Sequence, residues 1–512
     1  MKKIKLLLIL AIGVILGLSL STLFSSLNEV RNTYFVNVSW KNFAKHYFNS
    51  KKTNCDTLYI QLNKKEFEEL NHQRKEALND NKDFNYVKGS IILNSDTSKI
   101  KIKLKGDRFV HFENETGWSF RIKTKKNLSL IPPKFSLHHP KTKNYIYEWL
   151  FHQALKREGI IALNYKFFQV HINNEDWGIY GLEEHFTDAL LSSNNRPHGP
   201  IFSVKEEYGA RFIDTPLVMP YNTDYVKNNE NDSIVHQAIK KLYNFYAGVE
   251  SVENTFNSNL IAKYFALCDL LSTHHGTVFK SLRIFYNPES KQFEPIGFDG
   301  HYGTDAIAST ITSEFSYMPE TGWNYEHDST WYQRFFQSEF IDDTLFHSYY
   351  YQHLTQFSKK SYLTNLLNDL QIELDINMGL IFKDFPPKAD HIFEFGPDYF
   401  NFNQYLYVNN QSRINEIIDK DYKIHCFIEN HDSTYTLSVN NISKFPLWLS
   451  SLSINDSLSI ALNKIIPPHK PYNYQSLKIN NQNNKFTKGK VEINYHIIGE
   501  EASRIEKVNK LK

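Results

Sequence analysis

Stretches of alternating apolar and polar residues dominate the chain between Thr57 and Val204. CDTLYIQLN, YVKGSIILN, SKIKIKLKGDRF and GWSFRIKTKKN place apolar side chains at every second position, as half-buried β-strands do. VHINNEDWGIYGLEEHF, with the residues before it, indicates two further strands around a polar turn at residues 173–176. Residues 57–204 are therefore predicted to form an α+β domain with a largely antiparallel sheet.

Helical spacing appears in two longer segments. TKNYIYEWLFHQALKREG places four apolar residues on one helix face: Ile146, Trp149, Leu150 and Ala154. SNLIAKYFALCDLLSTHHG has the same spacing, and a predicted β-hairpin, SLRIFYNPESKQFEPIGFD, follows it and ends at Asp299. Residues 331–378 are aromatic-rich and helical in pattern.

The pattern changes near Tyr422. Short strands such as KIHCFIEN, TYTLSVNN and KVEINYHII are separated by turns rich in Asn, Ser, Asp and Pro. This spacing predicts a β-sandwich of about 90 residues, immunoglobulin-like in size. The predicted fold class is thus α+β, with a main domain at residues 55–421 and a β-sandwich at residues 422–512.

The N-terminus carries a targeting pattern. MKKIK is basic, and the run from Leu6 to Phe24 contains no charge. A membrane-spanning helix needs about 20 apolar residues, whereas the apolar part of a signal peptide needs roughly 7 to 15. Residues 1–24 are predicted to be an uncleaved signal anchor, with a cleaved signal peptide as the alternative, and residues 25–54 a stalk. The positive-inside rule keeps the N-terminus in the cytoplasm and exports the body of a single-pass membrane protein, or of a secreted one if the segment is cleaved.

Composition narrows the classes of function. Of the 512 residues 41% are hydrophobic and 15% aromatic, as in a packed globular protein. Lys and Arg number 58 against 56 Asp and Glu, so no overall basic field attracts nucleic acid. Cys55, Cys268 and Cys426 are widely spaced and odd in number, which gives neither a metal knuckle nor a disulfide framework. High contents of Asn, Lys, Ile, Tyr and Phe indicate an AT-rich bacterial genome, and hence a bacterial membrane.

Candidate chemistry begins at Asp299, which ends the apolar run FEPIGFD and is followed by Gly300. A strand-end carboxylate before glycine can hold a divalent ion near phosphates, because the strand fixes the oxygen and the glycine lets a ligand approach. The alternative is a turn aspartate that caps backbone amides.

Basic residues are concentrated on two predicted strands. Lys105 ends one of them, and Arg121 and Lys123 share one face of the next because side chains alternate along a strand. A solvated sheet face is the alternative. Of the adjacent Glu183 and Glu184, one points inward and one outward, and Glu184 is expected to face the site. Cations for phosphates, a glutamate that orients a cation and an aspartate for a metal are the parts of a phosphotransferase.

Four blocks in this order resemble the spore-coat protein H (CotH) kinase family: LKGDR, WSFRIK, VHINNEDWGIYGLEEHF and SLRIFYNPESKQFEPIGFDGHYG. The resemblance extends over residues 102–302. It implies an atypical protein-kinase-like, two-lobed fold that transfers phosphate from ATP with Mg²⁺ or Mn²⁺. It assigns Asp299 to the metal, and it assigns nucleotide binding to Lys105, Arg121, Lys123 and Glu184.

The chain departs from the family pattern at three positions. Gly297 stands where the family has the first residue of an Asp-x-Asp pair, and Trp118 stands where it has a basic residue. The aspartate expected before the hairpin falls at His275, which is predicted to act as a catalytic base or phosphate contact. A surface or polar core histidine is the alternative. A zinc site is a further alternative, with the candidate ligands His274, His275, His301 and Asp299.

Two functions from different classes follow. The first is an exported, membrane-anchored kinase-like enzyme that phosphorylates a hydroxyl of a protein or an envelope polymer. The second is a non-catalytic pseudokinase that acts as an envelope binding or structural protein. Asp299 and the basic strands favour the first. The scarcity of ATP outside the cytoplasm and the missing carboxylates favour the second.

Overall fold

The computed structural model describes Ser21 and residues 40–510, apart from several gaps. The gaps are residues 80–82, 107, 127, 206–216, 278–280, 301–342, 385–405, 420–423, 432–433, 444, 456–457, 468–474 and 481–488. Within the described part of the chain, no helix combines the length and the apolar character needed to cross a membrane. The predicted transmembrane signal anchor is thus not found in the part of the chain that the structure describes. The run on which the prediction was based, Leu6 to Phe24, lies outside the described residues except for Ser21.

Seven strands near the N-terminus form a closed barrel in the order β1-β2-β3-β4-β5-β7-β6. Their bounds are β1 (Thr57–Gln61), β2 (Val87–Leu93), β3 (Asp96–Leu104), β4 (Phe120–Thr124), β5 (Lys134–His138), β6 (Tyr165–Ile172) and β7 (Glu175–Glu184). Alternate residues such as Ile102, Ile122 and Phe135 fill the barrel, which leaves the charged positions between them on its outer face. All of the pairings are antiparallel except that of β1 with β6, and this parallel pair closes the barrel.

The two strands predicted around residues 173–176 are confirmed as β6 and β7. Asn173 and Asn174 have φ angles of 52° and 68°, as a tight hairpin turn requires. Helix α3 (Lys64–Leu78) lies beside the barrel, and α4 (Tyr147–Arg157) connects β5 to β6. Four short 3₁₀ turns are described as well: η1 (Phe109–His111), η2 (Pro140–Lys143), η4 (Asn229–Asn231) and η5 (His274–Thr277).

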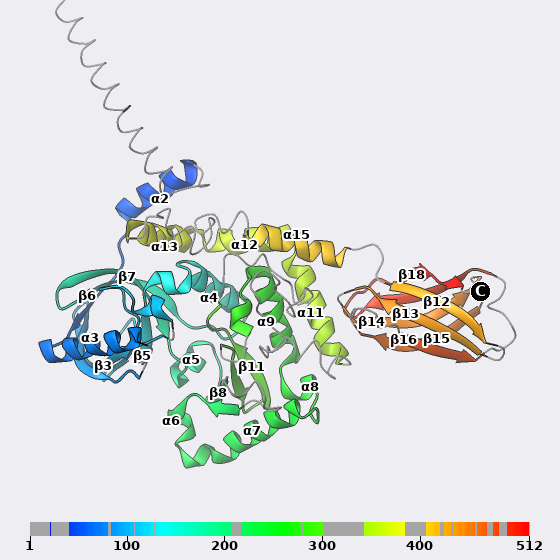
Figure 1. Cartoon of the computed structure of the whole chain (residues 1–512), viewed down its shortest axis with the longest axis horizontal. Helices are drawn as coiled ribbons and strands as arrows, with labels where there is room; N and C mark the ends of the chain where they lie inside the picture. The colour runs from blue at the N-terminus through cyan, green and yellow to red at the C-terminus, as the bar shows by residue number, and fades with distance from the viewer. Residues whose placement is uncertain are drawn as a thin grey trace, which may run out of the picture.

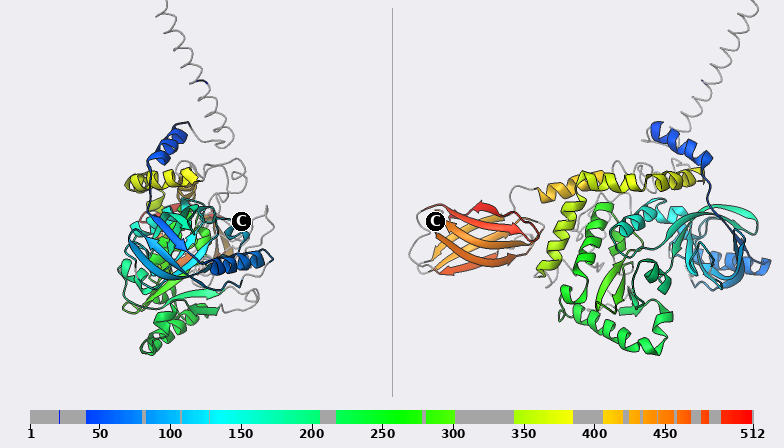
Figure 2. Two further views of the ribbon diagram at one scale, coloured as in Figure 1. Left: turned by 90° about the vertical axis from the view of Figure 1, so that its left-hand side faces the viewer. Right: turned by 180° about the vertical axis from the view of Figure 1, so that it is seen from behind.

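A second region follows the barrel and is built on a four-stranded sheet in the order β11-β10-β8-β9. The strands are β8 (Ile201–Lys205), β9 (Leu217–Pro220), β10 (Arg283–Asn287) and β11 (Gln292–Ile296), and β10 with β11 confirms the predicted hairpin. The helices around it are α5 (Asp188–Ser193), α6 (Thr223–Val226), α7 (Asp232–Tyr246), α8 (Val252–Thr255) and α9 (Ser258–Leu271). In Figures 1 and 2 this sheet and its helices lie between the barrel and the C-terminal sheets.

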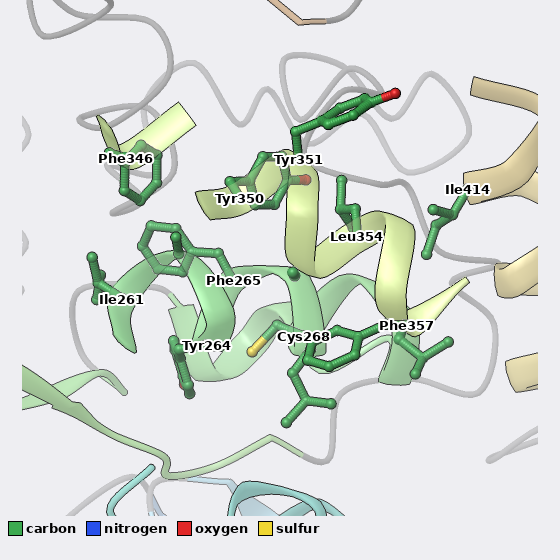
Figure 3. Close-up of a cluster of buried hydrophobic side chains, with 14 of the residues drawn as sticks. Ile261, Tyr264, Phe265, Cys268, Phe346, Tyr350, Tyr351, Leu354, Phe357 and Ile414 are labelled. Carbon is green, nitrogen blue, oxygen red and sulfur yellow. The ribbon is translucent and has the colours of Figure 1, made fainter. Parts of the chain in front are cut away.

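Helix α9 packs along α11 (Thr344–Phe357) and forms the centre of the largest core. Figure 3 shows Phe265 and Cys268 of α9 facing Tyr350 and Leu354 of α11. Within this interface the Tyr350 hydroxyl donates to Asp269 Oδ2 at 2.6 Å. The buried carboxylate of Asp269 is therefore part of the helix packing.

Three further helices form a row above this core: α12 (Lys360–Asp369), α13 (Gln371–Asp384) and α15 (Leu406–Ile418) (Figures 1 and 2). Helix α2 (Trp40–Lys52), within the predicted stalk, packs on α13. Lys45 Nζ lies 2.6 Å from Asp375 Oδ1, and a Cβ on Gly379 would lie 2.8 Å from Thr53 Oγ1.

The last region consists of two four-stranded sheets, β16-β13-β12-β19 and β15-β14-β17-β18 (Figure 1). Its strands are β12 (Ile424–His431), β13 (Thr434–Asn441), β14 (Leu447–Ile454), β15 (Leu458–Ile466), β16 (Gln475–Asn480), β17 (Val491–Ile497), β18 (Arg504–Lys507) and β19 (Asn509–Lys510). Phe445 packs on Tyr351 of α11, with ring centroids 5.2 Å apart. Helices and sheets are thus both present, as the α+β class predicts, whereas the kinase-like and immunoglobulin-like assignments stay predictions.

Candidate functional site

A buried ion pair joins the end of β3 to β7. Lys105 Nζ lies 3.1 Å from Glu183 Oε2, 2.9 Å from His138 Nε2 and 3.2 Å from Ser136 Oγ. The side chain of Glu183 is 1% exposed and that of Lys105 is 19% exposed. The pair forms because Ser136 of β5 is the direct partner of Glu183 in the sheet, so Glu183 and the cations of the outer barrel face lie on the same side.

The two charges of this pair perturb each other and their neighbours. Burial lowers the pKa of Lys105 to about 7, and nearby Arg121 and Lys143 add to the lowering while Glu183 opposes it. Burial alone would raise the pKa of Glu183, but Lys105, Lys143 and His138 hold it well below its usual range. Glu183 is therefore a carboxylate at neutral pH, whereas Lys105 loses its proton near neutrality.

Asp299 follows β11 with a φ of 58°, in the left-handed region. Its backbone N–H donates to Glu148 Oε1 of α4 at 3.1 Å. At the next residue, a Cβ on Gly300 would lie 2.5 Å from the Phe151 ring of α4. The glycine that was expected to admit a ligand thus lets the chain pack on α4.

Both carboxylate oxygens of Asp299 face donors. Lys143 Nζ lies 2.5 Å from Oδ1, and His275 Nδ1 and the Ser281 hydroxyl lie 3.1 and 3.3 Å from Oδ2. Lys143 Nζ is also 3.4 Å from Glu183 Oε1, and its side chain is only 3% exposed. Lys143 therefore links Asp299 to the Lys105–Glu183 pair. We call these four residues the charged quartet.

Cations face one another across the outer surface of the barrel. Direct cross-strand partners in the sheet form one row of four lysines and a second row of two residues, and we call the six the cation ladder: Lys88, Lys101, Lys123, Lys134, Lys103 and Arg121. Like charges directly opposite each other destabilise a sheet. The stability of the fold therefore does not explain why these six cations lie opposite one another.

Among the described residues the ladder has few compensating contacts, one of which is a hydrogen bond of 3.2 Å from Lys103 Nζ to the Phe84 carbonyl. Lys103 and Lys123 place Nζ 5.2 and 5.0 Å from the centre of the Tyr86 ring. Arg121 Nε is buried and has no hydrogen-bond partner among the described residues. Burial lowers the pKa of Lys134 to about 8, helped by Arg121 and Lys123 and opposed by Asp224 of α6.

Aromatic rings cover the end of the ladder that adjoins the quartet. The Phe298 ring lies 5.0 Å from Lys143 Nζ, 5.7 Å from Lys105 Nζ and 5.2 Å from the Arg283 guanidinium. Arg283 also stacks over Tyr221, at 4.8 Å. Cation–π contacts of this kind stabilise buried cations without neutralising them.

The structure brings most of the predicted site residues together. Asp299 and His275 are in contact, Lys105 joins Asp299 through Glu183 and Lys143, and Arg121 perturbs the pKa of Lys105. Lys123 lies farther along the ladder and is exposed.

The choice between the two glutamates needs correction. Glu184 accepts hydrogen bonds from the backbone N–H and Nδ2 of Asn164, at 3.2 and 2.8 Å. Adjacent strand residues point to opposite faces, so Glu183 faces the site and Glu184 points away from it.

Three residues of the site were missed. Glu183 differs from its neighbour Glu184 only in sheet register, Lys143 lies in a 3₁₀ turn without periodic pattern, and His138 is a single histidine on a short strand. A known β5–β7 register would have identified Glu183, but no local signal marks Lys143.

The residues around Asp299 do not fit the predicted metal. Mg²⁺ needs oxygen ligands at about 2.1 Å in octahedral geometry, whereas both Asp299 oxygens face an ammonium, an imidazole or a hydroxyl. Among the described residues, no group of three or more His, Cys, Asp and Glu side chains is arranged for a metal ion. His301, a candidate zinc ligand, lies outside the described residues.

Comparison with family models and curated proteins gives no relative. The sequence matches no family model, and no curated protein is significantly similar to it. The resemblance to the CotH kinase family therefore stays a prediction, and the kinase, ATP and magnesium predictions gain no support.

Proposed function

We propose that the chain binds a phosphate-bearing anion on the outer face of β3, β4 and β5, beside the Lys105–Glu183 pair. The observation that supports this is the register of the cation ladder, which sets Lys103 opposite Arg121 and Lys123 opposite Lys134. An anion bound on this face supplies counter-charge that the described acids near it, Asp83 and Asp224, provide only weakly. Arg121 is the main contact, because a guanidinium binds two oxygens of a phosphate at once.

Thermal unfolding of the chain at low ionic strength tests the proposal, with ATP, pyrophosphate and sulfate as probes. A ligand that prefers the folded state raises the unfolding midpoint with its concentration. We expect a rise with pyrophosphate and ATP that weakens in 0.5 M NaCl, because salt screens exposed charges. Arg121→Gln should lose most of the rise. Lys166→Gln, which removes an exposed lysine from β6, should keep it.

Two results would contradict this function. One is the absence of a shift with all three anions. The other is an equal shift in the Arg121→Gln variant, which would place the anion elsewhere.

A second candidate function is phosphoryl transfer from a nucleotide to a hydroxyl. It is favoured by the Lys105–Glu183 pair, since a lysine held by a glutamate also positions the nucleotide phosphates in protein kinases. Release of phosphate from labelled ATP, with and without candidate hydroxyl acceptors, measures the activity. Lys105→Met keeps the apolar stem and removes the charge, so it should abolish turnover, and turnover that persists in this variant would exclude the role of Lys105.

A further inference from the structure

Lys143 occupies the position between two carboxylates. Its Nζ is 2.5 Å from Asp299 Oδ1 and 3.4 Å from Glu183 Oε1, on side chains of which Glu183 is 1% and Asp299 21% exposed. Two carboxylates drawn to one point in a buried site repel each other unless a cation lies between them. In many phosphate-binding sites that cation is a divalent metal.

Lys143 is anchored for this role. It ends the 3₁₀ turn η2, which begins at Pro140, and its side chain is almost completely buried. Burial opposes its charge, but Asp299, Glu148 and Glu183 raise its pKa well above the usual lysine value. The ammonium therefore stays charged at neutral pH.

Among the described residues, the charges of the neighbouring groups leave no role for a metal. The remaining oxygens of the two carboxylates face Lys105, His138, His275 and Ser281. A metal ion placed at Asp299 Oδ1 would lie against the Lys143 ammonium, and the two cations would repel each other.

We propose that the Lys143 ammonium stands in place of a divalent cation between Glu183 and Asp299, so that the site binds its anion without metal. Only the statement that the site binds its anion without metal rests on the proposed anion-binding function. Lys143 is a positioning residue here, because it neutralises the two carboxylates that would otherwise repel a phosphate bound at Arg121 and Lys105.

Manganese binding tests the inference without any anion. Mn²⁺ is titrated into the chain, and free Mn²⁺ is followed by its electron paramagnetic resonance signal. The wild-type chain should have no Mn²⁺ site that is lost in the Asp299→Asn variant. Lys143→Ala opens the space between the carboxylates. It should bind Mn²⁺ at least about tenfold more tightly than the wild type, and Mn²⁺ should raise its unfolding midpoint. Lys141→Ala, on the same turn but paired with Glu113 near the surface, is the matched control and should gain no site.

Each outcome decides the inference. A wild-type Mn²⁺ site that disappears in Asp299→Asn overturns it, and so does a folded Lys143→Ala variant that gains no Mn²⁺ site. If Lys143→Ala does not fold, the wild-type and Asp299→Asn titrations still decide. Anion binding is measured separately, in EDTA and in MgCl₂. Anion binding that requires MgCl₂ overturns the claim that the site works without metal. If no anion binds, the proposed function is overturned, and the manganese titrations alone then decide whether Lys143 takes the place of a divalent cation.

Discussion

Replacing Arg121 should stabilise the unliganded barrel while weakening anion binding. Arg121 is the direct cross-strand partner of Lys103, and it lowers the pKa values of Lys105 and Lys134, which places it close to three other cations. Each like-charged cross-strand pair costs roughly 0.2–1 kcal/mol. Its buried Nε, without a hydrogen-bond partner among the described residues, adds about 1 kcal/mol of desolvation cost.

Arg121→Gln removes these costs and keeps most of the apolar stem. The shorter side chain loses about 0.5 kcal/mol of buried surface, somewhat less than one methylene group. The net expectation is that the free energy of unfolding of the barrel rises by about 1 kcal/mol. A residue that served only to stabilise the fold would show the opposite sign, since most substitutions of partly buried residues destabilise.

Hydrogen exchange of the β3, β4 and β5 amides measures this effect locally, which suits a chain with several separately packed regions. The slowest amides of these strands should exchange about fivefold more slowly in Arg121→Gln than in the wild type, and the difference should shrink in 0.5 M NaCl. Lys166→Gln is the control and should change little. Faster exchange in Arg121→Gln, or a difference that salt does not alter, would refute the view that the cation ladder is a strained binding surface.

Two further predictions concern the charged quartet and its neighbours. The pKa values of Lys105 and Lys134 in the folded chain, about 7 and about 8, lie below the ordinary lysine value of 10.5. At a pH between the folded and the ordinary values, the unfolded chain therefore binds more protons than the folded one. The free energy of unfolding should therefore rise with pH from about 7 to about 10, while the affinity for sulfate, which does not titrate, should fall. Urea titrations and calorimetry across this range test both trends, and an affinity that is flat in pH would contradict them. Glu183→Gln leaves Lys105 and Lys143 buried with one counter-charge fewer and should destabilise the chain by about 3 kcal/mol. Glu184→Gln retains its hydrogen bonds to Asn164 and should cost less than about 1 kcal/mol in the same urea titration.

The sequence predicted the local elements of the fold well, because hydrophobic periodicity reflects which side of a strand or helix is buried. Helices α4 and α9, the β6–β7 turn and the β10–β11 hairpin all lie where the patterns place them. Closure of the barrel could not be predicted in the same way. It depends on the parallel pairing of β1 with β6, which joins Leu58 to Val170, and no local pattern encodes so distant a partner.

The candidate site was predicted in part for the same reason. Arg121 and Lys123 were placed on one face by the alternation of a strand, and Asp299 by the end of an apolar run. The distinction between Glu183 and Glu184 depends on a sheet register that a single strand does not determine. Lys143 could not be predicted because it lies in a 3₁₀ turn, and only tertiary packing places that turn beside Asp299.

The charges of the site divide into two groups with different physical consequences. In the quartet, two carboxylates face two lysines inside the protein. The four charges cancel while Lys105 is protonated, and removal of any one leaves another buried without its partner. In the cation ladder, Arg121, Lys103 and Lys134 face one another at the surface, and the acids that act on the two lysines, Asp83 and Asp224, oppose burial and repulsion only weakly. Changes in the quartet should therefore act mainly on folding, and changes in the ladder mainly on binding. Because Lys105 belongs to the quartet and is also lowered in pKa by the ladder, it is the one residue whose replacement should affect both, and its proton should be taken up when an anion binds.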